Sequence, residues 1–229
     1  MKVIFEILRR KNAEEKPYIQ NFEYEYTDPL ETVATALKNI NESLPFPDRI
    51  RWECSCMQKK CGACAMLIDG RPRLACDEKL ADHGERIRLE PLKKFPPVAD
   101  LIVDRQAVFD SLKELAVWFE NTAEPSEKRA DTVHEASRCL QCGCCLEVCP
   151  NFSTDSKFKG MAAAVPLSRL IAEADEDEKK RIFKTYSKNF YAGCGKSLAC
   201  RDICPAGIDT EELMVRSNAA AIWGKKRKK

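Results

Sequence analysis

The concentration of cysteine in residues 139–150, CLQCGCCLEVCP, constrains this chain more than any other feature of its sequence. The chain has 13 cysteines in 229 residues, and they fall in three groups at 54–76, 139–149 and 194–204. The N-terminus has only a short apolar stretch before a basic run and no small-residue cleavage site, so we expect no secretory signal. In a chain that is not exported, clustered cysteines indicate metal binding rather than disulfides.

Composition and charge exclude several classes of protein. The chain is 44% hydrophobic and 32% charged, which is ordinary for a soluble protein. No apolar run approaches the roughly 18 residues that a membrane span requires. The net charge of +2 gives no reason to expect a nucleic-acid partner. The basic tail, residues 225–229, is either a solvated chain end or a weak electrostatic contact to an anionic membrane surface.

The first half of the chain has the pattern of a small mixed sheet crossed by one helix. Apolar and polar residues alternate as in half-buried strands, and Asp69-Gly70 predicts a tight hairpin. The strand candidates are 3–7, 22–26, both arms of 65–76, and 86–90. Thr27 or Asp28 is expected to cap a helix that opens at Pro29.

Three prolines in residues 91–100 predict a linker, and helical periodicity begins beyond it. Residues 104–121 would form a helix with one apolar face, made by Val108, Leu112, Leu115 and Phe119. Further helices are expected at 132–140, 165–174 and 210–223. The two halves therefore predict an α+β chain with two domains.

The first cysteine group has the spacing of plant-type [2Fe–2S] ferredoxins. Cys56, Cys61 and Cys64 carry that spacing, and the fourth thiolate comes from farther along the chain. Cys76 supplies it, because the predicted hairpin returns it to the loop. A zinc site is the alternative, although zinc ligands usually come as two short knuckles. Cys54 lies outside the pattern and is expected to be a small half-buried thiol.

The second group matches the C-x2-C-x2-C-x3-C-P run of two-cluster bacterial ferredoxins. In that run three thiolates hold one cubane and the fourth reaches the other cluster. The matching residues are Cys139, Cys142, Cys145, Cys149 and Pro150. Cys144 is surplus to the motif.

The third group repeats this template with one change, because Ser197 stands where the second cysteine belongs. If the ligands cross over between the groups, Cys204 completes the first cubane. The predicted [4Fe–4S] ligands are then Cys139, Cys142, Cys145 and Cys204. The other site is left with Cys149, Cys194 and Cys200. Three thiolates suit a [3Fe–4S] cluster, which lacks the iron that the missing ligand would hold.

With these three sites in this order, the chain resembles the iron–sulfur subunits of succinate dehydrogenase and fumarate reductase. The resemblance covers roughly residues 1–223 and includes CGACAMLIDGRPRLAC, IRLEPLKKFPPVADLIVDRQAVFDSLK and CLEVCPNFSTDSKFKG. These stretches look most like the subunits of Gram-positive, menaquinone-linked enzymes. The resemblance implies a β-grasp [2Fe–2S] ferredoxin domain at 1–95, followed by an all-α ferredoxin domain at 96–229.

The resemblance also implies a function in electron transfer. Electrons would pass from the FAD of a flavoprotein subunit through the [2Fe–2S], [4Fe–4S] and [3Fe–4S] clusters to menaquinone, or in the reverse direction. A membrane-anchor subunit, with or without haem, would hold the chain as a peripheral protein on the cytoplasmic side of the cell membrane. Substrate chemistry would belong to the flavin. The chain itself shows no dicarboxylate site, nucleophilic dyad or glycine-rich phosphate loop.

One departure from the family limits what can be carried over. Many ubiquinone-linked members follow the second motif with tryptophans and place a histidine after the first cysteine of the third, where they help bind quinone. Here residues 151–153 read NFS and Gly195 follows Cys194, so that pocket is not expected. The alternative function is an iron–sulfur adaptor of a soluble flavoprotein reductase or oxidase, although such relatives often carry additional cysteine-rich domains.

Overall fold

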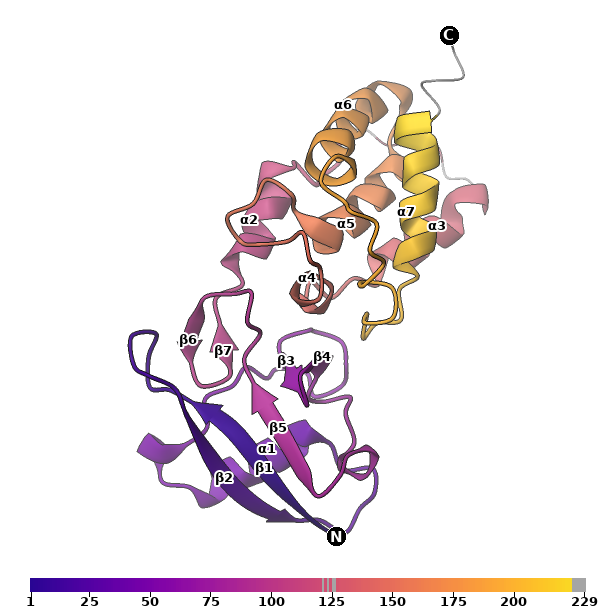
Figure 1. Cartoon of the computed structure of the whole chain (residues 1–229). Coiled ribbons are helices and arrows are strands. Elements are labelled where there is room, and N and C mark those ends of the chain that lie inside the picture. The colour runs from indigo at the N-terminus through magenta and orange to yellow at the C-terminus, as the bar shows by residue number, and fades with distance from the viewer. Residues whose placement is uncertain (121, 123, 125–126, 224–229) are drawn as a thin grey trace. The chain divides into compact units, whose positions relative to one another are not determined.

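The computed structural model describes residues 1–120, 122, 124 and 127–223, so the basic tail at 225–229 lies outside the described residues. The chain divides into two compact units, Met1–Arg105 and Gln106–Lys229 (Figure 1). The described strands belong to the first unit, and the described part of the second unit is helical. This division agrees with the α+β class expected from the sequence.

A mixed sheet of five strands, in the order β2-β1-β5-β3-β4, forms the centre of the first unit. β1 pairs antiparallel with β2 and parallel with β5, while β3 pairs antiparallel with β4 and β5. The strands are β1 (Lys2–Arg9), β2 (Tyr18–Glu25), β3 (Ala65–Ile68), β4 (Arg71–Leu74) and β5 (Arg86–Glu90). The predicted strands are thus confirmed, and the sheet with its single long helix has the expected β-grasp architecture.

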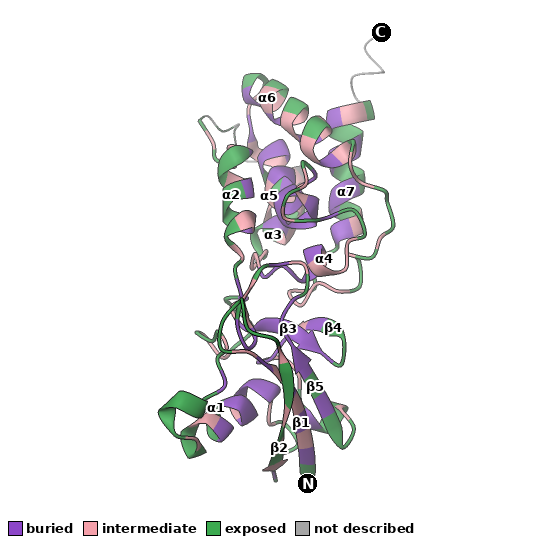
Figure 2. Cartoon of the chain, turned by 60° about the vertical axis from the view of Figure 1, so that its left-hand side comes forward, coloured by how far each residue is buried: buried purple, intermediate pink, exposed green. Residues whose placement is uncertain are grey.

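The core of this unit lies between the sheet and α1 (Val33–Ser43). Val3, Phe5 and Ile7 alternate along β1 and are at most 2% exposed. The helix contributes Leu37, which is fully buried, and four further buried residues, Val33, Ala34, Ala36 and Ile40 (Figure 2). Each fully buried side chain of the size of leucine or phenylalanine stabilises the fold by about 1.5–3 kcal/mol.

Helix α1 begins later than the sequence predicted. Its N-cap is Thr32, whose hydroxyl accepts a hydrogen bond from the Thr35 N–H at 3.2 Å. Asp28 instead closes a preceding turn, because its carboxylate accepts from the Leu30 N–H at 2.8 Å. Aspartate and threonine stabilise turns and helix starts by the same kind of hydrogen bond, so sequence alone placed the cap one turn too early.

Residues 91–100 are packed into the first unit, and the prediction of a linker there was wrong. Leu92 and Phe95 are 1% and 2% exposed. Beyond them β6 (Pro97–Ala99) pairs with β7 (Ile102–Val103) as a short hairpin. Prolines are compatible with such edge strands, and they therefore do not mark a domain boundary here. The first unit extends to Arg105, past the boundary expected after residue 95.

Asp100 fixes this hairpin to the rest of the unit. The carboxylate is buried, accepts from the backbone N–H groups of Arg10 and Arg51 at 2.8 Å, and pairs with the Arg9 guanidinium at 3.1 Å. A buried carboxylate is tolerated only when it is paired and hydrogen-bonded, as it is here. Asp100 therefore connects β1, the chain before the first cysteine group and the β6–β7 hairpin.

The helices of the second unit pack around α5 (Gly160–Glu173) (Figures 1 and 2). Its neighbours are α2 (Gln106–Glu114), α3 (Glu127–Ser137), α4 (Cys144–Glu147), α6 (Glu176–Tyr186) and α7 (Thr210–Asn218). Two π-helical segments, η3 (Ser187–Tyr191) and η4 (Ala219–Trp223), continue α6 and α7. Within the described part of the chain, no helix is long and apolar enough to cross a membrane.

The helix predicted at 104–121 is shorter in the structure. α2 ends at Glu114, and Ala116 adopts the left-handed region with φ of 49°. An ordinary residue in that region cannot continue a right-handed helix. Val108 and Leu115 are buried, as the pattern predicted, whereas Leu112 and Phe119 are only half-buried.

Candidate functional site

The β3–β4 hairpin brings the ends of the first cysteine group together. Asp69 and Gly70 form the turn, with φ of 49° and 77°, and the strands pair from Ile68–Arg71 back to Ala65–Leu74. At the open end, the Ala75 N–H donates to the carbonyl of Cys64 at 3.1 Å. Cys64 and Cys76 therefore lie on neighbouring strand ends, as the hairpin prediction required.

The loop between the other two cysteines directs backbone N–H groups at sulfur. The N–H groups of Gln58 and Lys60 each donate to the Cys56 sulfur at 3.3 Å. The Lys59 N–H donates to the Cys76 sulfur at 3.2 Å. Such donors stabilise negative charge on sulfur, so the loop suits thiolates that bind a metal cluster.

The ionisation of the thiols differs sharply within this group. The hydrogen bonds from Gln58 and Lys60 lower the pKa of Cys56 to about 7. Burial raises the pKa of Cys64 to about 12. A thiol as buried as Cys64 is deprotonated only when a bound cation compensates its charge, which is how a metal cluster would hold it.

Arg105 forms hydrogen bonds that hold the same loop in place, and the sequence did not predict this role. Its guanidinium donates to the carbonyls of Gly62 and Ala63 at 2.9 and 3.0 Å. It also forms an ion pair with Glu53. Arginine can hold several acceptors in one fixed geometry. Arg105 lies more than 40 residues along the chain from the loop, so no local sequence pattern predicts this contact.

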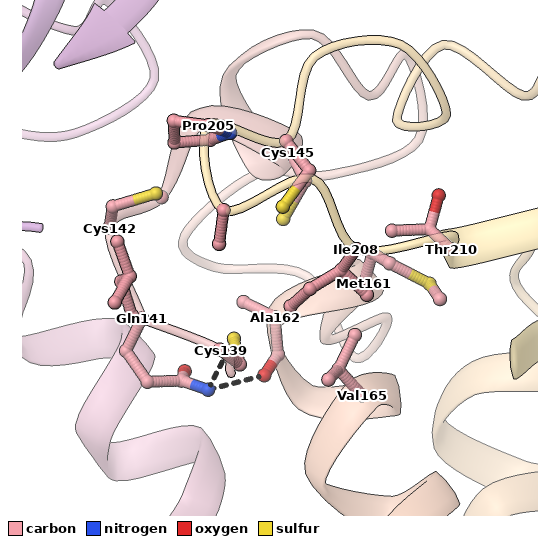
Figure 3. Close-up of a pocket in the computed structure, with 14 residues that line it drawn as sticks. Cys139, Gln141, Cys142, Cys145, Met161, Ala162, Val165, Pro205, Ile208 and Thr210 are labelled. Atoms are coloured by element: carbon pink, nitrogen blue, oxygen red, sulfur yellow. Dashed lines mark hydrogen bonds between the residues drawn. The ribbon is translucent and has the colours of Figure 1, made fainter. Parts of the chain in front are cut away.

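The second and third cysteine groups meet in the second unit. A cavity, called here the Cys139 cavity, is lined by the four predicted [4Fe–4S] ligands, Cys139, Cys142, Cys145 and Cys204. Figure 3 labels the first three of them. The first three come from the turn that leads into α4 and from α4 itself, and the fourth comes from the segment before α7. The crossing of ligands between the two groups is therefore consistent with the geometry.

The wall of the Cys139 cavity is otherwise mainly apolar, with side chains that include Met161, Val165 and Ile208. Burial raises the pKa of Cys139 to about 11 and raises the pKa of Cys145 and Cys204 as well. Thr210 also lines the cavity, and its side chain is buried.

A second cavity, called here the Cys194 cavity, is lined by the remaining three predicted ligands, Cys149, Cys194 and Cys200. Ser197 lines it too, so the structure brings the serine to the position inferred from spacing. Cys145 and Met161 line both cavities, which are therefore neighbours. Burial raises the pKa of Cys200.

The two surplus cysteines lie apart from these cavities. Cys54 is exposed rather than half-buried, and its thiol donates to the Met57 sulfur at 3.1 Å. Cys144 is fully buried in α4 and is not among the residues that line either cavity. The hydrogen bond that the Cys144 thiol donates to Cys142, together with burial, raises the pKa of Cys144.

Single-ion binding has no candidate among the described residues, where no three histidine, cysteine or acidic side chains are arranged to hold one metal ion. A [4Fe–4S] or [3Fe–4S] cluster is bound differently, because each thiolate binds a different iron of an extended group. The cysteine-lined cavities therefore have the donor set of clusters.

Comparison with known proteins identifies the family of the chain. A family model for a 2Fe-2S iron-sulfur cluster binding domain matches residues 4–110, and one for a 4Fe-4S dicluster domain matches residues 135–208. The succinate dehydrogenase iron-sulfur subunit of Bacillus subtilis (strain 168) is 34% identical over 220 residues, which cover 89% of this chain and 86% of the relative. The chain belongs to the family of succinate dehydrogenase and fumarate reductase iron–sulfur subunits.

Other members and the fold support the same assignment. The fumarate reductase iron-sulfur subunit of Haemophilus influenzae is 27% identical over 225 residues, with 89% of this chain and 87% of the relative covered. A chain of the Mycobacterium smegmatis Sdh1 complex in the apo form has the same fold, with a TM-score of 0.78 and 19% identity over 95% of this chain and 96% of that one. As an iron–sulfur subunit of this family, the chain transfers electrons through [2Fe–2S] and [4Fe–4S] clusters within an oxidoreductase complex.

Proposed function

We propose that the chain holds three clusters on eleven cysteines and carries electrons between a flavin and a quinone. Cys56, Cys61, Cys64 and Cys76 would bind the [2Fe–2S] cluster. Cys139, Cys142, Cys145 and Cys204 would bind the [4Fe–4S] cluster, and Cys149, Cys194 and Cys200 a [3Fe–4S] cluster. The observation that carries this proposal is that the seven predicted ligands of the second unit line two adjacent cavities. Cys139, Cys142 and Cys204 line only the first, Cys149, Cys194 and Cys200 line only the second, and Cys145 lines both.

Ser197 supports the three-iron form of the third cluster. It lines the Cys194 cavity together with the three cysteines. A neutral hydroxyl is a poor iron ligand beside thiolates, because soft thiolates suit iron–sulfur clusters. The cubane corner that faces Ser197 would therefore lack its iron.

The partners follow from the family. A flavoprotein subunit with FAD would exchange electrons with the [2Fe–2S] cluster, and a membrane-anchor subunit would hold the chain peripherally at the cytoplasmic face of the cell membrane. The [3Fe–4S] cluster would exchange electrons with the quinone. Succinate oxidation or fumarate reduction itself would occur at the flavin.

The residues around Gly195 do not suit the quinone pocket of ubiquinone-linked members, and the proposal of menaquinone, held mainly by the anchor subunit, comes from the family resemblance. The Asn151 side chain donates to the Gly193 carbonyl at 2.7 Å. A Cβ atom at Gly195 would lie 3.0 Å from the Asn151 Nδ2, so the histidine of ubiquinone-linked members would be crowded here. The short side chains at these positions support a quinone contact unlike that of the ubiquinone-linked enzymes.

Metal analysis of anaerobically purified protein tests the cluster assignment. The expected content is about nine irons per chain and no stoichiometric zinc, as the three cluster types require. Electron paramagnetic resonance (EPR) of the oxidised protein should show a [3Fe–4S] signal. Eight or fewer irons at full occupancy, or zinc near one per chain, would contradict the assignment.

A further inference from the structure

Gln141 makes two contacts that the electron-transfer function does not by itself explain. Its side-chain amide donates to the Cys139 sulfur at 3.1 Å and to the Ala162 carbonyl at 3.1 Å (Figure 3). One NH2 group therefore joins a predicted cluster ligand to the backbone of the central helix α5. Gln141 also holds a left-handed backbone conformation, with φ of 53°, which residues other than glycine rarely adopt.

The Ala162 carbonyl is free to accept because of a proline one turn later. In a regular helix the N–H of residue 166 would donate to the carbonyl of residue 162. Residue 166 is Pro166, which lies inside α5 and has no N–H. The proline thus leaves an acceptor on the helix at the point where Gln141 reaches it.

The orientation of the amide follows from its partners. A carbonyl and a cluster-bound thiolate are both acceptors, so the NH2 group must face them and the amide oxygen must face away. The Gln141 Oε1 is indeed buried and has no hydrogen-bond partner within the described residues. The two hydrogen bonds that the Gln141 NH2 group donates hold the amide in this orientation. They must therefore outweigh the free-energy cost of burying the Oε1 acceptor without a hydrogen bond.

We propose that Gln141 raises the reduction potential of the cluster in the Cys139 cavity, and that Pro166 positions the Gln141 amide by freeing the Ala162 carbonyl. This inference rests on the proposed ligand assignment. Reduction adds one electron to the cluster and makes its thiolates more negative. A hydrogen bond to a charged acceptor strengthens as the negative charge grows, and hydrogen bonds to sulfur are among the factors that set cluster potentials. Gln141 therefore favours the reduced form.

The test is a redox titration of the full chain, followed by EPR, with dithionite as reductant. Gln141→Met keeps the length of the side chain and removes the donor. The reduction potential of the [4Fe–4S] cluster should fall by ~59 mV. This shift corresponds to about a tenfold decrease in the equilibrium constant for one-electron reduction of the cluster. Gln106→Leu is the matched control, because Gln106 is exposed on α2 and donates to Asp110. It should leave the potential unchanged.

Pro166→Ala tests the positioning role without disturbing the cavity wall. The new N–H of residue 166 would compete with Gln141 for the Ala162 carbonyl. The [4Fe–4S] potential should therefore fall, but by less than in Gln141→Met. The double variant with Gln141→Met should match Gln141→Met alone, since coupled residues are not additive.

Each part of this inference can be overturned separately. An unchanged potential in Gln141→Met with an intact [4Fe–4S] signal would refute the role of Gln141. An unchanged potential in Pro166→Ala, or additive shifts in the double variant, would refute the role of the proline. If the wild-type protein gives no [4Fe–4S] signal, the proposed ligand assignment itself fails.

Discussion

Cys56 and Cys64 show how strongly single residues of one loop can differ in chemistry. With a pKa of about 7, Cys56 is about half thiolate at pH 7, whereas Cys64, with a pKa of about 12, is a neutral thiol. In protein freed of clusters by a chelator, iodoacetamide should therefore modify Cys56 first, because the thiolate is the nucleophile. Its rate should fall about tenfold per pH unit below 7 and level off above it.

Peptide mass spectrometry measures this order of modification. Cys144 is the internal control, because it is fully buried and its pKa is raised. It should remain unmodified at every pH tested while the fold persists. Faster labelling of Cys64 than of Cys56 would show that the loop hydrogen bonds do not control the reactivity of these thiols.

Ser197 offers a second prediction at the scale of one residue. Ser197→Cys places a thiolate beside Cys149, Cys194 and Cys200 in the Cys194 cavity, and should allow a [4Fe–4S] cluster to form there. The [3Fe–4S] signal of the oxidised protein should weaken or disappear, and the potential of this site should change with cluster type and charge. Ser153→Cys is the control, since exposed Ser153 does not line the cavity. A variant that keeps the full wild-type signal would contradict the role assigned to Ser197.

At the scale of elements, the β3–β4 hairpin positions Cys76 through the backbone of its turn. Gly70 has φ of 77°, and a Cβ atom there would meet nothing within 4 Å, so only backbone strain opposes substitution. Gly70→Ala should cost about 1–2 kcal/mol. The [2Fe–2S] absorption should therefore be lost at a lower temperature on heating.

Gly84→Ala is the matched control for this turn. Gly84 lies in the same unit, also has open space for a Cβ atom, and does not hold a positive φ. Its substitution should change stability by less than about 0.5 kcal/mol, as expected for an exposed site without special geometry. Equal effects of the two substitutions would mean that turn conformation does not hold the hairpin.

Elements that follow from local sequence patterns were predicted correctly, whereas contacts between distant segments were not. Cysteine spacing within each group is local and matches a known two-cluster template, so the pairing of the two groups could be anticipated, and the alternation of residues in β1 and β5 predicted their strands. The bracing of the loop by Arg105 and the bond from Gln141 to Ala162 depend on contacts between distant segments. The prolines at 91–100 were misread because proline fits both a linker and the edge of a packed hairpin.

For the whole molecule, the proposed tether is the anchor subunit rather than the basic tail. Each basic residue near an anionic membrane surface contributes on the order of 1 kcal/mol at best, and salt screens it. Deleting residues 225–229 should therefore leave most of the assembled complex on the membrane. Sedimentation of membranes with an antibody against the chain measures this. Complete release on deletion would identify the tail as the tether.

The division of cluster ligands between distant segments has a consequence for how the protein is made. The first unit has its cysteines complete by Cys76, whereas the Cys139 cavity also needs Cys204. A ribosome adds about 5–20 residues per second, so the thiols at 139–149 wait for seconds before their partners at 194–204 are synthesised. Chains arrested before residue 194 should therefore carry iron in the first unit alone, and the nascent second unit depends on the cell to keep its cysteines reduced until translation ends.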